Sequence, residues 1–194
     1  MVANQLVKIA RMMLSLHEHH HERLKEMVKT RTDIPVLEGP SSHEEGWHSR
    51  SVLGHIEWTK ANSDKAYAVA GIDIREVAAL HDIGKIIDAK IKPDGTFSFK
   101  GHEISGADYL KNERSWHSLL DEEIEIIRHH GSMRKGIDHI HLTPEGLKKL
   151  AVLELCDEFG KWSQEHRPPK GDETKMLAQR QAVVDGAKKY LVML

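Results

Sequence analysis

The chain has 194 residues, 39% of them hydrophobic, which suits one domain with a substantial core but not two. Its 28 lysines and arginines nearly balance 30 acidic residues, so the net charge of -2 gives no electrostatic reason to bind nucleic acid or a membrane surface. The single cysteine, Cys156, excludes an internal disulfide, and no run of 18 apolar residues occurs. We therefore expect a cytoplasmic protein, and its 15 histidines need an explanation.

Apolar residues recur with helical spacing along almost the whole chain. This spacing predicts a first helix from about residue 3 to about residue 30, and then a loop that ends near Ser41 or Ser42, either of which could cap the next helix. The second helix should end at Gly71. A third should begin after a cap at Asp73 and stop at Gly84.

The second half of the chain continues the helical pattern. The stretch IKPDGTFSFKG predicts a turn or short hairpin, and helices are expected at about 102–112, 121–130, 143–164 and 173–194. The strand signal is too thin for a sheet-based fold, so we predict a single all-α domain over residues 1–194 with its motifs in a core of about 44–163. The last helix could pack on the domain or form a homodimer interface, and the sequence favours neither.

Several ionisable residues fall on apolar helical stripes that should face the core: His55, His81, His130 and Asp157. Burying unpaired groups of this kind costs free energy, so residues from separate helices are best explained by mutual satisfaction around a metal. For any one of them taken alone, a hydrogen-bonded core residue is the commoner explanation.

The stretch AALHDIGK places His81 and Asp82 side by side at a predicted helix end. It resembles the HD superfamily of metal-dependent phosphohydrolases. The resemblance continues in order through residues 48–162, with His55 before this stretch, GHEISGADYL and IIRHHG after it, and LAVLELCDEFGKW as a closing aspartate helix. It implies the helical bundle of an HD domain.

The resemblance also implies a set of metal ligands. The first site would use His55, His81, Asp82 and Asp157, and the second would use His102 and His130, with Asp82 as the bridge and His129 as a competitor of His130. Such ligands suit two divalent transition metal ions, namely manganese, iron, cobalt, nickel or zinc. Two metals of this kind can bind a phosphate oxygen and generate a bridging hydroxide as the nucleophile.

Further residues are candidates for the chemistry. Asp82 and Lys85 are the predicted catalytic residues; Lys85 would neutralise a phosphoryl oxygen, and the alternative is a solvated lysine near a helix end. Arg50, Arg128, Arg134 and Lys135 could grip phosphates or be solvated. In the stretch HEHHH, His17 and His20 are in step with Met13 and Leu24, so they should point inward, either as partly buried histidines or as lining of the substrate pocket.

The resemblance implies a phosphohydrolase that acts on a phosphorylated small molecule, a nucleotide phosphate ester or anhydride. GHEISGADYL and IIRHHG are similar to the HD domain of CCA-adding tRNA nucleotidyltransferases, and the two-metal layout is similar to that of stand-alone nucleotide hydrolases. Two alternatives stay open: a mixed-valence di-iron oxygenase of an organophosphonate or polyol, which uses the same ligands, and a non-catalytic binding module.

Overall fold

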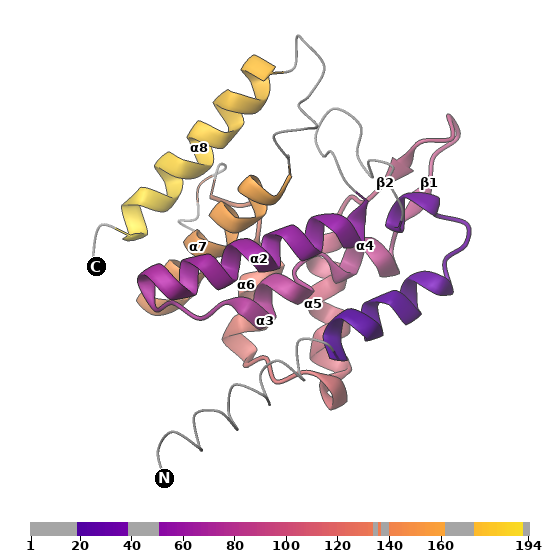
Figure 1. Cartoon of the computed structure of the whole chain (residues 1–194), viewed down its shortest axis with the longest axis horizontal. Coiled ribbons are helices and arrows are strands. Elements are labelled where there is room, and N and C mark those ends of the chain that lie inside the picture. Colours follow the sequence, from indigo (N-terminus) through magenta and orange to yellow (C-terminus); the bar gives the residue numbers. More distant parts are fainter. Residues whose placement is uncertain (1–18, 39–50, 134–135, 137–139, 162–172, 192–194) are drawn as a thin grey trace.

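The computed structural model describes residues 19–38, 51–133, 136, 140–161 and 173–191, which are almost entirely helical (Figure 1). Residues 19–29 form a helix. The elements that follow are η1 (Pro35–Leu37), α2 (Val52–Ala70), α3 (Arg75–Leu80), α4 (Ile83–Ile87), β1 (Lys90–Ile91), β2 (Phe97–Ser98), α5 (His102–Asn112), η2 (Arg114–Trp116), α6 (Asp121–His129), α7 (Pro144–Gly160) and α8 (Glu173–Leu191). The prediction of an all-α fold is confirmed.

The stretch with turn residues forms a short antiparallel hairpin, within which Lys90 pairs with Ser98 and Ile91 with Phe97. The side chain of Asp94 accepts a hydrogen bond from the backbone N–H of Thr96 and closes the connecting turn. Within the described residues this pair of strands is the only sheet.

A serine cap begins the long helix α2, and a glycine ends it. The Ser51 side chain accepts a hydrogen bond from the N–H of Gly54 and caps the start of the helix, so the cap is not Ser41 or Ser42, which lie outside the described residues. The helix ends before Gly71, as predicted, because that residue adopts a left-handed conformation with φ of 71°.

The prediction of one uninterrupted helix between Asp73 and Gly84 is wrong. Helix α3 ends at Leu80 and α4 begins at Ile83, so the chain turns at His81 and Asp82, and Gly84 lies inside α4. Asp73 does accept a hydrogen bond from the N–H of Arg75, although it stands one residue before the cap position. Gly84 is needed for close packing against α5 and not for ending a helix.

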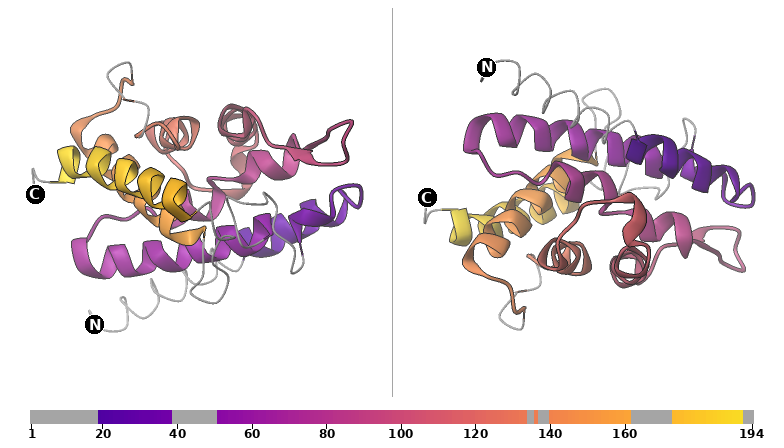
Figure 2. Two further views of the ribbon diagram at one scale, coloured as in Figure 1. Left: turned by 90° about the horizontal axis from the view of Figure 1, so that it is seen from above. Right: turned by 90° about the horizontal axis from the view of Figure 1, so that it is seen from below.

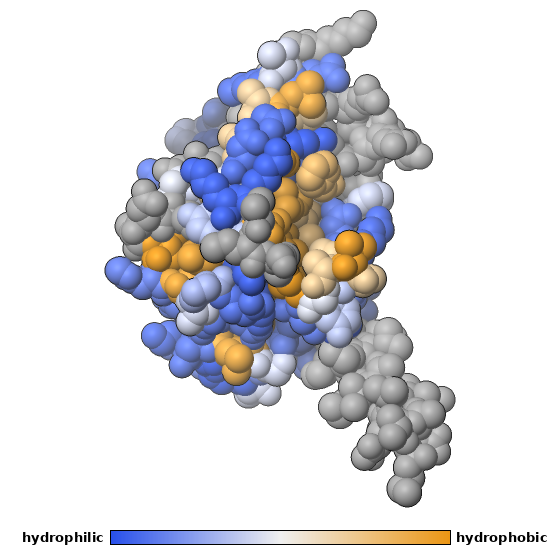
Figure 3. Space-filling model, turned by 90° about the vertical axis from the view of Figure 1, so that its left-hand side faces the viewer, coloured by the Kyte–Doolittle hydropathy of each residue, from blue (hydrophilic) through white to orange (hydrophobic). Residues whose placement is uncertain are grey.

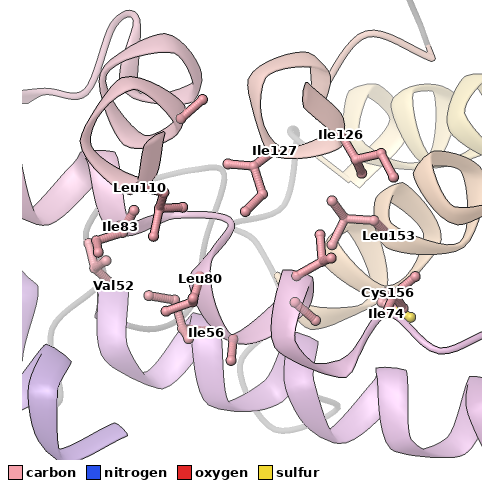
Figure 4. Close-up of a cluster of buried hydrophobic side chains, with 14 of the residues drawn as sticks. Val52, Ile56, Ile74, Leu80, Ile83, Leu110, Ile126, Ile127, Leu153 and Cys156 are labelled. Atoms are coloured by element: carbon pink, nitrogen blue, oxygen red, sulfur yellow. The ribbon is translucent and has the colours of Figure 1, made fainter. Parts of the chain in front are cut away.

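The helices pack around one hydrophobic core. Helix α2 packs on α3 and α7, while α5 lies beside α4 and α6 (Figures 1 and 2). The core between these helices is drawn in Figure 4, where the labelled side chains are Val52, Ile56, Ile74, Leu80, Ile83, Leu110, Ile126, Ile127, Leu153 and Cys156. The histidines and the aspartate predicted on the apolar stripes, His55, His81, His130 and Asp157, are buried with this core.

The C-terminal helix α8 packs on the domain. It lies along α7 and buries Met176, Val183 and Ala187 against it (Figure 1). Leu177 on the same helix is 51% exposed, so this packing covers only part of the apolar side chains of α8, and a homodimer interface stays a prediction.

The helix at residues 19–29 is attached to the core at its end. Its buried Leu24 and Val28 join the core, and Arg31 donates hydrogen bonds to the backbone oxygens of Ile86, Ile87 and Ala89 at the end of α4. A positively charged side chain is favourable there because helix carbonyls carry partial negative charge. Residues 1–18 of the predicted first helix lie outside the described part.

On the face that Figure 3 shows, the coloured surface is largely hydrophilic, with apolar side chains gathered in several places. Exposed large apolar side chains of α2, α7 and α8 include Val69, Phe159 and Leu177. None of the described helices combines the length and the hydropathy that crossing a membrane requires.

Candidate metal centre

Three histidines of the predicted ligand set are oriented in the same way. The Nδ1 atoms of His81, His102 and His130 lie 2.8, 2.8 and 2.6 Å from the backbone oxygens of Ala78, Phe99 and Ile127, each three residues earlier. A hydrogen bond from Nδ1–H to a carbonyl fixes the ring and leaves the lone pair of Nε2 for a ligand. Local backbone therefore aims all three Nε2 atoms at one place.

Asp82 lies at that place, and its two oxygens face different groups of histidines. Oδ2 is 3.4 Å from Nε2 of both His55 and His81. Oδ1 is 3.1 Å from Nε2 of His102 and 3.4 Å from Nε2 of His130. Asp82 thus joins two trios of potential metal ligands, His55–His81–Asp82 and Asp82–His102–His130.

Asp157 adds a second carboxylate on one side of the cluster. Its Oδ1 lies 2.8 Å from Nε2 of His55 and 3.7 Å from Nε2 of His81. The trio of His55, His81 and Asp82 therefore has a further carboxylate oxygen nearby that could serve as a fourth ligand.

The arrangement of donors fits metal ions. Nε2 of His102 lies 3.1 Å from Nε2 of His130, and Nε2 of His81 lies 3.4 Å from Nε2 of His55. Lone pairs of neutral imidazoles repel one another at such distances unless a cation or proton lies between them. Mixed imidazole and carboxylate ligands suit manganese, iron, cobalt, nickel or zinc.

Two close helix contacts bring the aspartates to their histidine partners. Gly84 lies directly against the backbone oxygen of His102 and the backbone nitrogen of Gly106, so α4 meets α5 without an intervening side chain. Gly160 lies in the same way against Thr59 of α2, one turn beyond His55 and Asp157. A Cβ atom at Gly84 would push Asp82 away from His102, and one at Gly160 would push Asp157 away from His55.

The pKa values of the cluster residues depend both on their burial and on the charges of their neighbours. Burial alone would raise the pKa values of Asp82 and Asp157, but the neighbouring lysines and histidines hold both well below the usual range. Burial disfavours a charge on His81, yet Asp82 and Asp157 more than offset this and raise its pKa to about 10. Burial lowers the pKa of His55. A protonated His81 thus offsets part of the negative charge of the two carboxylates, and a metal ion bound by His81 would displace that proton.

Lys85 is buried and not solvated. Its Nζ lies 2.8 Å from Oδ2 of Asp82, one helical turn away, and its side chain is 5% exposed. The alternative of a solvated lysine near a helix end is therefore wrong, and Lys85 acts on the charge of the carboxylate that joins the two trios.

Comparison with known families bears on this cluster. A family model described as the HD domain matches residues 46–185, which include every histidine and aspartate of the two trios. The chain belongs to the HD domain family. No curated protein and no solved structure matches it significantly. Because HD domains bind divalent metals and generally act as metal-dependent hydrolases, the family and the cluster together indicate this broad class of activity.

Of the two adjacent histidines at the end of α6, His130 belongs to the cluster, because its Nε2 lies 3.4 Å from Oδ1 of Asp82. Nε2 of His129 instead lies 3.9 Å from Glu125 on its own helix, and its side chain is partly exposed. The chain leaves the helical conformation at His130, with ψ of 145°, and this change turns neighbouring side chains in different directions.

Of the predicted phosphate-binding arginines and lysines, only some lie in the part of the chain that the structure describes. Arg128 pairs with Asp108 of α5 at 2.6 Å, which joins α6 to α5, and with Glu125 of its own helix at 3.2 Å. Arg50, Arg134, Lys135 and His17 lie outside the described residues. A phosphate-binding role for any of these stays a prediction.

His20 points inward, as its position on the stripe predicts, but it meets a different set of residues. Its Nε2 lies 3.1 Å from Oε1 of Glu76, and its ring packs edge-on to Trp116. Glu76 also accepts hydrogen bonds from the N–H and hydroxyl of Ser118. His20, Glu76 and Ser118 border a cavity of about 410 Å³ whose lining includes none of the cluster histidines. His20 therefore attaches the helix at residues 19–29 to α3.

Three polar residues on α7 were not among the predicted site residues. Lys161 lies 3.4 Å from Oδ2 of Asp157, and Glu158 is buried beside it. Glu154, also buried, accepts a hydrogen bond from the N–H of Met133 and so holds the loop that follows His130. The helical spacing of Glu154, Asp157 and Lys161 is the sequence feature that could have predicted that these residues lie near one another.

Proposed function

We propose that this HD protein is a metal-dependent phosphohydrolase that acts on a nucleotide phosphate ester or anhydride. The observation that carries the proposal is the position of Asp82, whose two oxygens face separate trios of ligand atoms. A carboxylate in this position supports the binding of two divalent metals. When bound, such a pair can polarise a phosphoryl oxygen and lower the pKa of water that attacks phosphorus.

The residues of the chain prepare the site for this chemistry. Backbone carbonyls orient His81, His102 and His130. His55 is a buried residue of α2. Because Asp82 and Asp157 have low pKa values, both are ionised at neutral pH and available as ligands. Burial of the cluster keeps most water away and strengthens its electrostatic interactions.

A phosphorylated substrate is supported by the basic residues at the cluster. Lys85 and Lys161 each lie beside one of the two carboxylate ligands. Once metal ions balance the carboxylates, these lysines leave the site with excess positive charge, which favours an anionic substrate. The nucleotide part of the proposal rests on the motifs shared with nucleotide hydrolases.

The test is to incubate the purified protein with Mn²⁺ and a panel of nucleotides, cyclic nucleotides and dinucleoside polyphosphates, and to identify products by mass spectrometry. Asp82→Ala should abolish product formation, while Asp64→Ala, which removes an exposed carboxylate of α2, should not. Full activity of Asp82→Ala would refute the proposal.

The other outcomes separate the two alternatives. If wild type forms no products, contains iron and consumes oxygen with an organophosphonate or polyol, the protein is a di-iron oxygenase. If it binds no metal under any of these conditions, a non-catalytic binding module is the better description.

A further inference from the structure

The two carboxylate ligands stand in matching local surroundings. In HDIGK, Asp82 is followed one turn later by Lys85, and in CDEFGK, Asp157 is followed one turn later by Lys161. The Nζ atoms lie 2.8 Å from Oδ2 of Asp82 and 3.4 Å from Oδ2 of Asp157. In both cases the lysine lies beside Oδ2. Oδ2 of Asp82 also faces His55 and His81, whereas Asp157 meets these two histidines through its other oxygen, Oδ1.

The two lysines differ in their access to solvent. The side chains of Asp82 and Lys85 are 2% and 5% exposed, so Lys85 lies behind the cluster. The side chains of Asp157 and Lys161 are 12% and 13% exposed. Of the two lysines, Lys161 is therefore the more accessible to an incoming substrate, and Lys85 is largely shielded from it. The side chain of His102, which is 16% exposed, is a second accessible part of the centre.

Lys161 is also held in place by a buried carboxylate that faces no histidine of the cluster. Its Nζ lies 2.8 Å from Oε2 of Glu158, whose side chain is 2% exposed. The other oxygen of Glu158 lies 3.9 Å from Nε of Arg180 on α8, and the Arg180 guanidinium stacks over Phe159. This chain of charges fixes the ammonium group at an accessible edge of the centre, which lowers the entropic cost of using it to bind an anion.

We propose that Lys161 is a substrate-binding residue that contacts the phosphoryl group, and that it favours a doubly charged phosphomonoester or terminal phosphate over a singly charged phosphodiester. The inference rests on the proposed phosphohydrolase function. Asp157 shares its charge with a metal when it serves as a ligand, so Lys161 is then left to pair with an incoming anion as well as with Glu158. Its attraction to a dianion is about twice that to a monoanion at the same distance.

The experiment measures binding of inorganic phosphate to the full-length, Mn²⁺-loaded protein by isothermal titration calorimetry. The variants are Lys161→Met, which removes the charge, and Lys161→Arg, which keeps it. Lys148→Met is the matched control, because Lys148 lies on the same helix, is 19% exposed and pairs with Glu145. Metal content and circular dichroism are recorded for each variant.

Loss of a charge-assisted hydrogen bond should weaken phosphate binding about tenfold or more in Lys161→Met. Lys161→Arg and Lys148→Met should bind nearly as wild type does. With 4-nitrophenyl phosphate and bis(4-nitrophenyl) phosphate as a matched pair, Lys161→Met should raise KM for the monoester much more than for the diester.

Unchanged phosphate affinity in Lys161→Met would overturn the proposal. Loss of metal from that variant would also overturn it, because Lys161 would then act on the ligand Asp157 and not on the substrate. If wild type binds phosphate but hydrolyses neither ester, the proposed phosphohydrolase function fails, while the binding comparison still decides the role of Lys161.

Discussion

Gly160 and Thr59 lie so close together that no side chain fits between their helices. A Cβ atom on Gly160 would lie 2.6 Å from Oγ1 of Thr59 and 3.2 Å from its backbone nitrogen. The contact is one turn away from both Asp157 and His55, whose side chains meet at 2.8 Å. The distance between these two ligands therefore depends on a glycine that takes no part in chemistry.

Gly160→Ala should lower the free energy of unfolding by about 1–3 kcal/mol, because the added methyl group overpacks the contact between α7 and α2. Adding Thr59→Ala should recover part of this loss, since the nearest clashing atom is the threonine hydroxyl oxygen. Urea denaturation of the two single variants and the double variant measures the coupling. Strictly additive effects would show that the contact is not the cause.

Gly84→Ala should be more harmful than Gly160→Ala, because its added Cβ would run into the backbone of His102 and Gly106, which no side-chain substitution can remove. We expect a loss of several kcal/mol or failure to fold. The comparison uses expression level and denaturation of both glycine variants. Equal stability of Gly84→Ala and wild type would contradict the close packing of α4 on α5.

Removal of individual histidines should separate the two trios. His102→Ala should reduce bound Mn²⁺ from two ions to one per chain, because His102 belongs only to the trio with His130. Asp82→Ala should reduce it further, since Asp82 belongs to both. Metal content after gel filtration, measured by inductively coupled plasma mass spectrometry, tests this. His129→Ala is the control and should keep both ions.

Lys85→Met should destabilise the metal-free protein by about 3 kcal/mol, because it leaves the buried Asp82 carboxylate without its nearest cation. The variant should gain more thermal stability from Mn²⁺ than wild type does, since the metal no longer shares Asp82 with an ammonium group. Differential scanning fluorimetry with and without Mn²⁺ measures both effects. Lys90→Met, at an exposed lysine paired with Asp88, should behave as wild type; an identical metal-induced shift in Lys85→Met would argue against the idea.

Glu76 should make the stability depend on acidic pH. Burial alone would raise its pKa, but hydrogen bonds from His20 and Ser118 lower it from 4.5 to about 2. Because the folded pKa lies below the unfolded one, this stabilisation is fully present above pH 4.5 and is lost as the pH falls towards 2. The shift corresponds to about 1–3 kcal/mol for this partly buried group.

Glu76→Gln should remove that part of the acid dependence while leaving the fold intact at neutral pH. Denaturant midpoints recorded between neutral pH and about pH 2 provide the measurement. Glu26→Gln breaks an exposed ion pair with Lys29 and serves as the control. An unchanged acid dependence in Glu76→Gln would show that the contacts of Glu76 do not stabilise the protein in this pH range.

Much of the fold follows from local patterns. Helical spacing of apolar residues predicts α5, α6 and α7 to within a few residues, because each helix buries one stripe in a shared core. It also predicts the end of α2 before Gly71, but not its start, which lies at Val52 after the cap Ser51. The same stripes carry His55, His81, His130 and Asp157, so the sequence indicates that these ionisable groups come together. The order of motifs then predicts the HD family that the comparison shows.

Other features depend on contacts between distant segments. His20 meets Glu76, and Lys161 meets the buried Glu158, only because separate turns or helices pack together. The break in the helix after Leu80 likewise accompanies the close packing of α4 on α5. The apolar spacing within residues 73–84 does not predict this break, because the contact involves residues of α5. The sequence by itself determined the apolar stripes, several of the ionisable residues that are buried on them and the family of the chain, because burying one face of a helix makes apolar residues recur with the helical period. Only the tertiary structure decided which buried groups face one another, because that depends on how closely two backbones approach.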